Sequence, residues 1–361
     1  MKKLLCILLC LVLLAGCAAP APGTEPEPIT AGEGPIRLSD AEIEFPADSG
    51  IHLAQEPTFT RVCITAPGVY RLTGSIAAGQ IFVDLGEQAA NDPKSAVVLI
   101  LDGAEILCRT APAILFSNVY EGGQPDSPTG AHILLAQGSG NRIAGSHTEE
   151  FDGAVYSRMS MKLSGTGSLR IEGDNEGLCS ERHLTIDSGT IHITSGNDGI
   201  NTNADGISVT TINGGTLLIE VTGSTGEGDG IDSNGAVVIN GGDVQSYACA
   251  DSGDFVLDAD LVVQINGGTV IATGNMLDRI ADGGQTYAAF SFAQRQTPGT
   301  YTLKNAAGET ALELTAVNDF QYLLLSAPAL TAGTFTLWSG DTQFQGIVGQ
   351  GGGFFGKIEP I

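Results

Sequence analysis

Three acidic residues in the middle of the chain stand at matching positions before a glycine. Glu176, Asp198 and Asp229 each precede Gly and then an apolar residue, twice as Asp-Gly-Ile. If these steps occupy equivalent places in stacked coils, their carboxylates lie one inter-strand spacing apart, about 4.8 Å. Such a ladder of like charges costs roughly 1 kcal/mol per pair in water and several-fold more when it is partly desolvated.

A cation would offset this charge, and no basic side chain of the same coils can do so. The chain contains no Lys or Arg between His183 and Asp278. Calcium suits the position, because it takes hard oxygen ligands from irregular loops. The predicted ligands are Asp and Asn residues of the two Asp-Gly-Ile steps and of the turns that follow them: Asp198, Asn201, Asn203, Asp205, Asp229, Asp232 and Asn234.

The turn after the first Asp-Gly-Ile step is similar to an EF-hand loop. Residues 201–206 read Asn-Thr-Asn-Ala-Asp-Gly, but the twelfth position is Ile212 rather than Glu, and no helices flank the segment. We therefore reject an EF-hand and keep a calcium loop. In the alternative interpretation, these Asn and Asp side chains only cap turns through hydrogen bonds to the backbone.

The elements that must position these residues repeat at nearly constant spacing. The second glycine of each turn recurs after 24, 26, 27 and 26 residues, at Gly165, Gly189, Gly215, Gly242 and Gly268. Short β-branched runs follow the turns, and no apolar period of 3.6 is present. The pattern predicts an all-β fold, a parallel β-helix. The unequal spacing after Gly274 predicts a C-terminal antiparallel β cap, in which Trp338 packs.

The N-terminal sequence predicts an exported lipoprotein. Residues 1–16 contain two lysines, an apolar run too short to span a bilayer, and Leu-Ala-Gly before Cys17, which is the residue that carries lipid after cleavage. We expect an extracellular monomer that is attached to the cell membrane by this lipid anchor. The predicted segments are the signal peptide 1–16, a Pro-rich tether 17–35, the β-helix 36–278, the cap 279–345 and a Gly-rich tail 346–361, with a surface loop at 120–130.

The charge of the chain excludes one class of partner. Removal of the signal peptide leaves 14 basic against 41 acidic side chains, a formal net charge of −27. We therefore expect no binding to nucleic acid and no attraction to an anionic membrane surface. Four cysteines remain besides the lipidated one, and they either form two disulfides or pack as small buried hydrophobes: Cys63, Cys108, Cys179 and Cys249.

The order of several short motifs resembles that of a family of secreted, largely clostridial, carbohydrate-binding proteins. They are Pro67-Gly-Val-Tyr-Arg-Leu-Thr-Gly74, Asp152-Gly-Ala-Val-Tyr-Ser157, the Asp-Gly-Ile steps and Gly299-Thr-Tyr-Thr-Leu303, and the resemblance covers roughly residues 36 to 345. It implies a right-handed parallel β-helix akin to polysaccharide lyases, on a calcium-bearing surface protein that binds plant or microbial polysaccharide, either cellulose-like or acidic and pectin-type. Ser180-Glu-Arg182 departs from the family's Ser-Lys-Asp.

Two other functions stay open. A calcium-dependent, pectate-type lyase needs an Arg or Lys base near C5 of a uronate. The basic residues on the coils before the acidic steps are the candidates: Arg158, Lys162 and Arg182, then Arg170 and, less favourably placed, Arg142. Because a surface Arg is usually solvated or ion-paired, we favour a non-catalytic binding module. In the third interpretation the protein is a scaffold or adhesin that binds no sugar.

Overall fold

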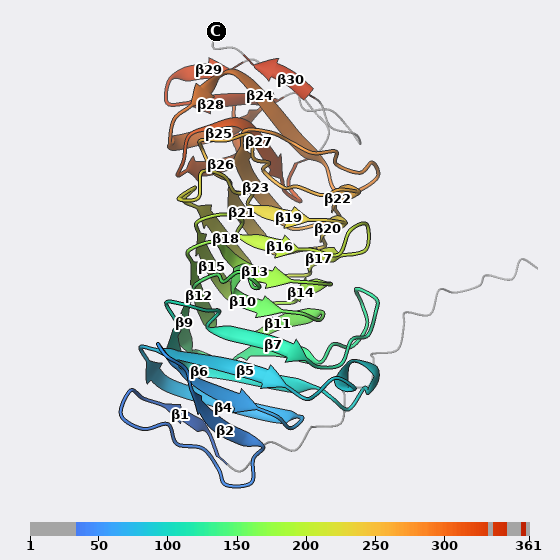
Figure 1. Cartoon of the computed structure of the whole chain (residues 1–361). Helices are drawn as coiled ribbons and strands as arrows, with labels where there is room; N and C mark the ends of the chain where they lie inside the picture. The colour runs from blue at the N-terminus through green and yellow to red at the C-terminus, as the bar shows by residue number, and fades with distance from the viewer. Residues whose placement is uncertain (1–33, 331–334, 345–354, 359–361) are drawn as a thin grey trace, which may run out of the picture.

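The structure is a computed structural model that describes residues 34–330, 335–344 and 355–358. Apart from one 3-10 turn, η1 (Ala89–Asn91), these residues form strands and loops, so the predicted all-β class is confirmed. The strands stack along the length of the molecule (Figure 1). Within the described ranges no helix is long and apolar enough to cross a bilayer. The predicted signal peptide and Cys17 lie outside them.

One side of the stack is an eight-stranded sheet, whose solvent side we call the first face. All its neighbouring strands pair in parallel except the first two, which are antiparallel. In chain order they are β2 (Ile51–Gln55), β3 (Thr60–Ile64), β5 (Gly79–Asp84), β7 (Ile114–Asn118), β10 (Gly153–Ser157), β13 (Glu176–Ser180), β16 (Ile200–Thr202) and β19 (Ile231–Ser233).

Two further parallel columns share one larger sheet, because the long strand β6 (Val97–Leu107) pairs with a strand of each. Their solvent sides are the second and the third face. The second face has β8 (Ala131–Leu135), β11 (Met161–Gly165), β14 (Leu184–Ile186), β17 (Val209–Ile212), β20 (Ala236–Ile239) and β22 (Val262–Ile265); the third has β9 (Gly140–Gly145), β12 (Ser168–Gly173), β15 (Thr190–Ser195), β18 (Thr216–Val221), β21 (Asp243–Tyr247) and β23 (Thr269–Gly274). Strands β1 (Ile36–Leu38) and β4 (Gly68–Ile76) extend this sheet before β6.

Stacked apolar side chains fill the interior between the faces. On the second face, equivalent isoleucines of four successive coils are Cα partners and are all buried: Ile186, Ile212, Ile239 and Ile265. The five turn glycines that predicted the repeat all have positive φ, between +84° and +113°. At Gly215 a Cβ would lie 2.5 Å from the carbonyl oxygen of Gly189 on the coil before, so both backbone angle and space require glycine.

The parallel stack ends at β23, which pairs antiparallel with β27 (Phe320–Ser326). The remaining strands of this end are β24 (Tyr287–Gln296), β25 (Gly299–Asn305), β26 (Thr310–Ala316), β28 (Phe335–Ser339), β29 (Thr342–Phe344) and β30 (Phe355–Ile358). β25, β26, β28 and β29 form a separate antiparallel sheet. Trp338 packs in it half-buried, with its indole donating to Thr336 and Lys304 over its ring. All four described cysteines are free buried thiols.

Candidate metal and saccharide site

The Asp-Gly-Ile step brings two polar side chains to the same side of the first face. A Cβ on Gly199 would lie 2.2 Å from Ile219 Cγ2 in the core, and one on Gly230 would lie 1.8 Å from Ser246 Oγ. The glycine therefore turns its empty side inward beside the buried isoleucine. The residue before the glycine and the residue after the isoleucine then meet, as Asn201 Nδ2 and Asp198 Oδ2 do at 3.3 Å.

Three carboxylates gather where the second Asp-Gly-Ile step meets the next coil. One oxygen each from Asp229, Asp232 and Asp258 lies within 4.8 Å of the other two. Asp258 comes from the following coil and donates its backbone N–H to Ile231 O of the Asp-Gly-Ile step at 2.8 Å. The sequence interpretation missed Asp258. Its signal was the repeat itself, because Asp258 follows Asp232 by 26 residues, as Gly268 follows Gly242.

A second group lies one coil earlier and is more deeply buried. The Asn201 amide donates to Glu176 Oε1 at 2.7 Å, and Asp198 Oδ1 accepts the backbone N–H of Asp229 at 2.7 Å. Glu176 and Asp198 are only 5% and 8% exposed. Glu176 Oε2 and Asn201 Oδ1 are buried, and no described residue hydrogen-bonds to either. Two oxygen atoms of one group thus lack the partners that buried polar atoms normally have.

These carboxyl groups ionise with difficulty because they are buried together. Burial, followed by repulsion from Asp198, raises the pKa of Asp229 to about 9. The same two causes raise the pKa of Asp232 to about 7, and burial with repulsion from Glu176 raises that of Asp198 to about 7. Burial raises the pKa of Glu176 to about 7. Nearby positive charge would favour ionisation, and the chain between His183 and Asp278 has no Lys or Arg to supply it.

The residues present fit a divalent cation with oxygen ligands. The three converging carboxylates match the ligand preference of calcium, and the unpartnered oxygens of Glu176 and Asn201 form a separate polar group on the preceding coils. The turn residues are arranged differently. Asn234 Nδ2 donates to Asn203 O and to Asp205 Oδ1, both at 3.0 Å, and so links the turns of two adjacent coils. The structure thus brings together Asp229 and Asp232, and separately Asp198 and Asn201.

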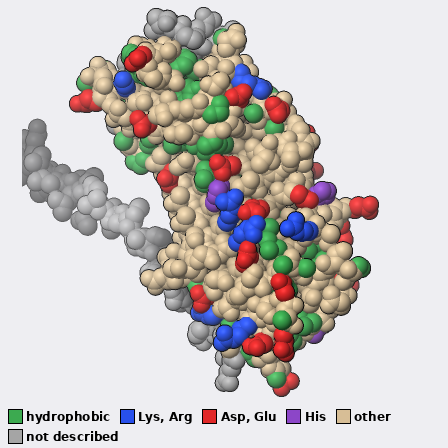
Figure 2. Space-filling model, turned by 90° about the vertical axis from the view of Figure 1, so that its left-hand side faces the viewer, with side chains coloured by type: hydrophobic (Ala, Val, Ile, Leu, Met, Phe, Trp, Pro, Cys, Tyr) green, Lys and Arg blue, Asp and Glu red, His purple; other side chains and the backbone are tan. Residues whose placement is uncertain are grey.

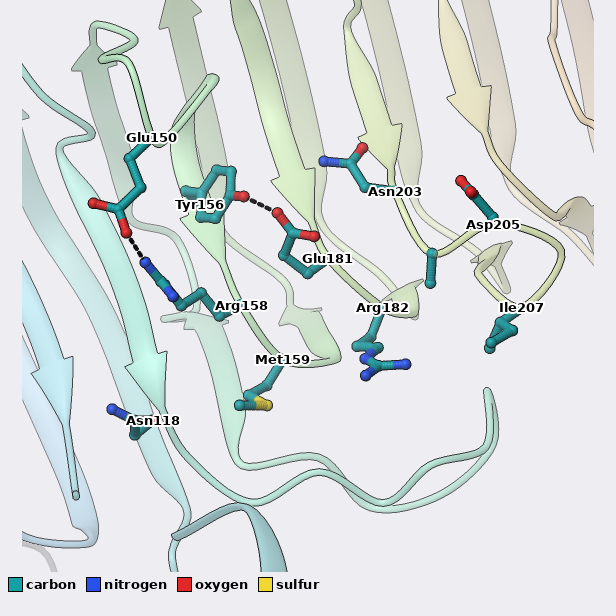
Figure 3. A pocket seen from close by; sticks show the side chains of 11 residues that line it. Asn118, Glu150, Tyr156, Arg158, Met159, Glu181, Arg182, Asn203, Asp205 and Ile207 are labelled. Atoms are coloured by element: carbon teal, nitrogen blue, oxygen red, sulfur yellow. Dashed lines mark hydrogen bonds and ion pairs between the residues drawn. The ribbon is translucent and has the colours of Figure 1, made fainter. Parts of the chain in front are cut away.

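A groove of about 860 Å³ lies on the same face, at the ends of β7, β10, β13 and β16. Figure 3 shows Tyr156 bonded to Glu181, and Arg158 paired with Glu150, along its wall. Arg182 is exposed in the groove, and among the described residues no acidic group pairs with its guanidinium. The groove lies next to the second acidic group. Asn203, which lines the groove, follows the end of β16, two residues after Asn201.

The other basic candidates lie on different faces. Lys162 is on β11 of the second face and pairs with Asp187. Arg142 and Arg170 are Cα partners on β9 and β12 of the third face, where both bind Glu172. Figure 2 shows basic and acidic side chains lying together on the side of the molecule that carries β9 and β12. Of the predicted bases, the structure therefore places Arg158 and Arg182 on the first face.

Comparisons with known proteins agree with this architecture. A family model described as "Carbohydrate-binding domain-containing protein" matches residues 59–312. A protein of the same description from Acetivibrio thermocellus is 28% identical over 191 residues, which are 50% of this chain and 60% of that relative, so the match spans less than two thirds of the relative's length. A solved structure, the gadolinium derivative of a polysaccharide lyase-like protein from C. thermocellum, matches with a TM-score of 0.55 and 24% identity. The match covers 67% of this chain and 92% of that protein's chain, and it shows that the two folds are alike. The predicted resemblance is confirmed, and the chain belongs to the carbohydrate-binding domain family.

Proposed function

We propose that the protein binds polysaccharide on its first face with the help of bound calcium. The observation that carries this proposal is the convergence of Asp229, Asp232 and Asp258 within 4.8 Å on coils without basic side chains. These three carboxylates would hold the ion. Calcium supplies positive charge for sugar hydroxyls and carboxylates, while the adjoining groove supplies Arg182, Asn203 and Asp205 as further partners.

The fold and the location complete this proposal. A right-handed β-helix would present the first face as a long, flat surface suited to a polymer. Lipidation of Cys17 and the tether up to residue 35 would hold that surface outside the cell membrane. Metabolic labelling with a fatty acid should mark the wild type and fail to mark Cys17→Ser. A labelled Cys17→Ser protein would contradict the anchor but leave the sugar site untouched.

The binding proposal is tested by affinity for polysaccharide with and without metal. Purified protein should be retained on polygalacturonate or cellulose in calcium and released by a chelator. Asp232→Asn should weaken retention at least tenfold, because it removes one charged ligand while keeping the side-chain shape. Asp243→Asn on the third face is the matched control and should behave like wild type. Binding to neither polymer would support the scaffold or adhesin interpretation instead.

A second candidate function is a calcium-dependent uronate lyase, and the unpaired guanidinium of Arg182 favours it. β-Elimination needs a base near C5, and Arg182 is the arginine of the groove without an acidic partner among the described residues. A lyase would release unsaturated, ultraviolet-absorbing product from polygalacturonate in calcium. Product that Arg182→Ala abolishes, while Arg71→Ala retains it, would assign catalysis to this protein. Wild-type protein that binds polygalacturonate and forms no product is a binding module.

A further inference from the structure

A second groove, of about 540 Å³, lies on the second face, away from the acidic groups. Its floor is formed by β11, β14, β17 and β20, and its roof is the loop between β7 and β8, which Figure 1 shows running along that side of the stack. The roof is held by Glu121, whose carboxylate accepts from both the N–H and the hydroxyl of Ser160. Thr185 also donates to Pro125 O at 3.4 Å. The loop predicted as a surface insertion therefore covers a preformed groove.

One buried histidine presents a fixed donor to this groove. His183 is 4% exposed and lines the groove, and its Nδ1 lies 3.1 Å from the backbone nitrogen of Val209. Because a backbone N–H can only donate, Nδ1 carries no proton, and the neutral ring has its proton on Nε2. Burial lowers the pKa of His183, which keeps the ring neutral. No described residue accepts a hydrogen bond from Nε2, so this donor is available to a ligand.

The floor alternates polar and apolar groups at the spacing of the coils. Asn213 donates to Asp187 and accepts from Asn240, each at 2.8 Å, so amide and carboxylate groups line one edge. Thr211 and Val238 are Cα partners and face outward between that edge and the roof. A ligand lying there meets hydroxyl and amide groups along one side and branched aliphatic carbon below.

The charges of the groove exclude an anionic ligand. Its lysine, Lys162, is already paired with Asp187, and Asp126 adds a further negative charge on the roof. The mixture of hydrogen-bonding groups and aliphatic surface excludes a purely apolar ligand. A sugar ring has hydroxyls at its edge and C–H groups on its faces, and the volume falls within the 300–1,000 Å³ of small-molecule sites.

We propose that this loop-roofed groove on the second face is a separate binding site for a neutral saccharide, with His183 Nε2–H as a hydrogen-bond donor and Thr211 and Val238 as its floor. The site shares no residue with the acidic groups of the first face. It therefore does not rest on the calcium proposal, and saccharide binding here should persist in a chelator. Two sites on two faces would let one molecule engage a glycan chain twice or bridge two chains.

The test is calorimetric or NMR titration of the full folded domain, in EDTA, with the β-1,4-linked tetrasaccharides of glucose, mannose and xylose. At least one should bind the wild type. Thr211→Trp fills the groove from an outward-facing strand position and should weaken binding at least tenfold. Gln264→Trp is the matched control, because Gln264 stands in the same outward column beyond Val238 and does not line the groove. It should change affinity less than twofold.

Further variants separate the alternatives. His183→Phe keeps a ring but removes the donor and should also weaken binding at least tenfold; if it fails to fold, Thr211→Trp still decides. Asp243→Asn on the third face lies outside both sites and should bind these tetrasaccharides like wild type. Three results would overturn the proposal: no binding of any of the three at millimolar concentration, equal binding by Thr211→Trp, or tetragalacturonate binding this groove more tightly than the neutral sugars.

Discussion

Asn201 and Asp232 are direct Cα partners on the adjacent strands β16 and β19, so an amide and a carboxylate stand side by side on the first face. The same column continues to Asp258, whose carboxylate meets those of Asp232 and Asp229. The amide side of the pair binds Glu176, and the carboxylate side is crowded by other acids. Within two coils, one column therefore changes from a hydrogen-bonded amide and carboxylate to three crowded carboxyl groups.

Calcium should stabilise the folded protein by binding to Asp229, Asp232 and Asp258. A ligand at 100 times its dissociation constant adds about 2.7 kcal/mol when it binds only the native state. Asp232→Asn should lose most of the calcium-dependent rise in melting temperature. Asp198→Asn should lose less, because Asp198 already accepts the N–H of Asp229 and is not one of the three converging carboxylates. Calorimetry of the metal-stripped variants, with and without calcium, measures these differences. If calcium raised the melting temperature of wild type and Asp232→Asn equally, Asp232 would not be a calcium ligand.

The stability of the metal-free protein should depend on pH in an unusual direction. The pKa of Asp229 is raised to about 9 and those of Asp198 and Asp232 to about 7, against about 3.9 for an unfolded Asp. The native state therefore binds more protons than the unfolded chain between these values, and stability falls as pH rises from about 4 towards 9. Each such proton contributes a slope of about 1.4 kcal/mol per pH unit.

Thermal melts of metal-stripped protein should thus give a higher melting temperature at pH 5 than at pH 8. Saturating calcium should flatten this dependence, because a cation stabilises the ionised carboxylates. Asp229→Asn should flatten it in the absence of metal. A metal-free protein that becomes more stable from pH 5 to pH 8 would show that these carboxyl groups do not dominate the titration.

The glycine of the Asp-Gly-Ile step should be irreplaceable. In Gly199→Ala the new methyl group would lie 2.2 Å from Ile219 Cγ2 and 2.6 Å from Gly230 O. Gly230 O is a backbone atom and cannot move aside freely. Overpacking of this kind costs about 1–3 kcal/mol. Gly140→Ala is the control, since its Cβ would meet nothing closer than Ser168 Oγ at 3.7 Å. Urea unfolding should show a clear loss for the first variant and a change within about 0.5 kcal/mol for the second.

The sequence predicted the parts of this structure that depend on local repetition. Each coil turns at a residue with positive φ, which glycine adopts readily, so the spacing of the glycines from Gly165 to Gly268 gave the coil length correctly. Alternating apolar residues marked the stacked strands, and the irregular region after Gly274 corresponds to antiparallel pairing. Handedness could not be derived from these spacings, because a repeat length is the same for either hand.

The details of the site depend on contacts between coils, which spacing alone does not determine. Asp258 was missed because Asp254-Phe-Val-Leu-Asp258 has no Asp-Gly-Ile step, although its repeat position matches that of Asp232. Asn203 and Asn234 are of residue types that bind metals, and only the structure shows that the Asn234 amide donates to the backbone carbonyl of Asn203 and links two coils. The groove on the second face could not be predicted from the sequence either, because its roof and floor meet through Pro125 and Thr185, which are 60 residues apart.

The charge network on the third face should stabilise the stack more than an isolated surface pair does. Arg142 binds Glu105 at 2.8 Å and Glu172 through two bonds of 2.7 and 3.2 Å, which ties three coils together. Hydrogen bonds from Arg142 hold the pKa values of both glutamates below their usual range. Since exposed pairs are worth about 0.2–1 kcal/mol each, Arg142→Ala should cost about 1 kcal/mol at pH 7.

This stabilisation should disappear in acid. A carboxyl group with a lowered pKa contributes stability above its unfolded pKa, about 4.3 for Glu, and loses it as pH falls through the folded value. Arg142→Ala and wild type should therefore differ at pH 7 and converge near pH 3. Arg71→Ala breaks a single exposed pair with Asp102 and is the matched control, with a smaller effect at pH 7. Urea midpoints at both pH values measure this, and an Arg142→Ala loss no larger than that of Arg71→Ala would show that the network adds nothing to its separate pairs.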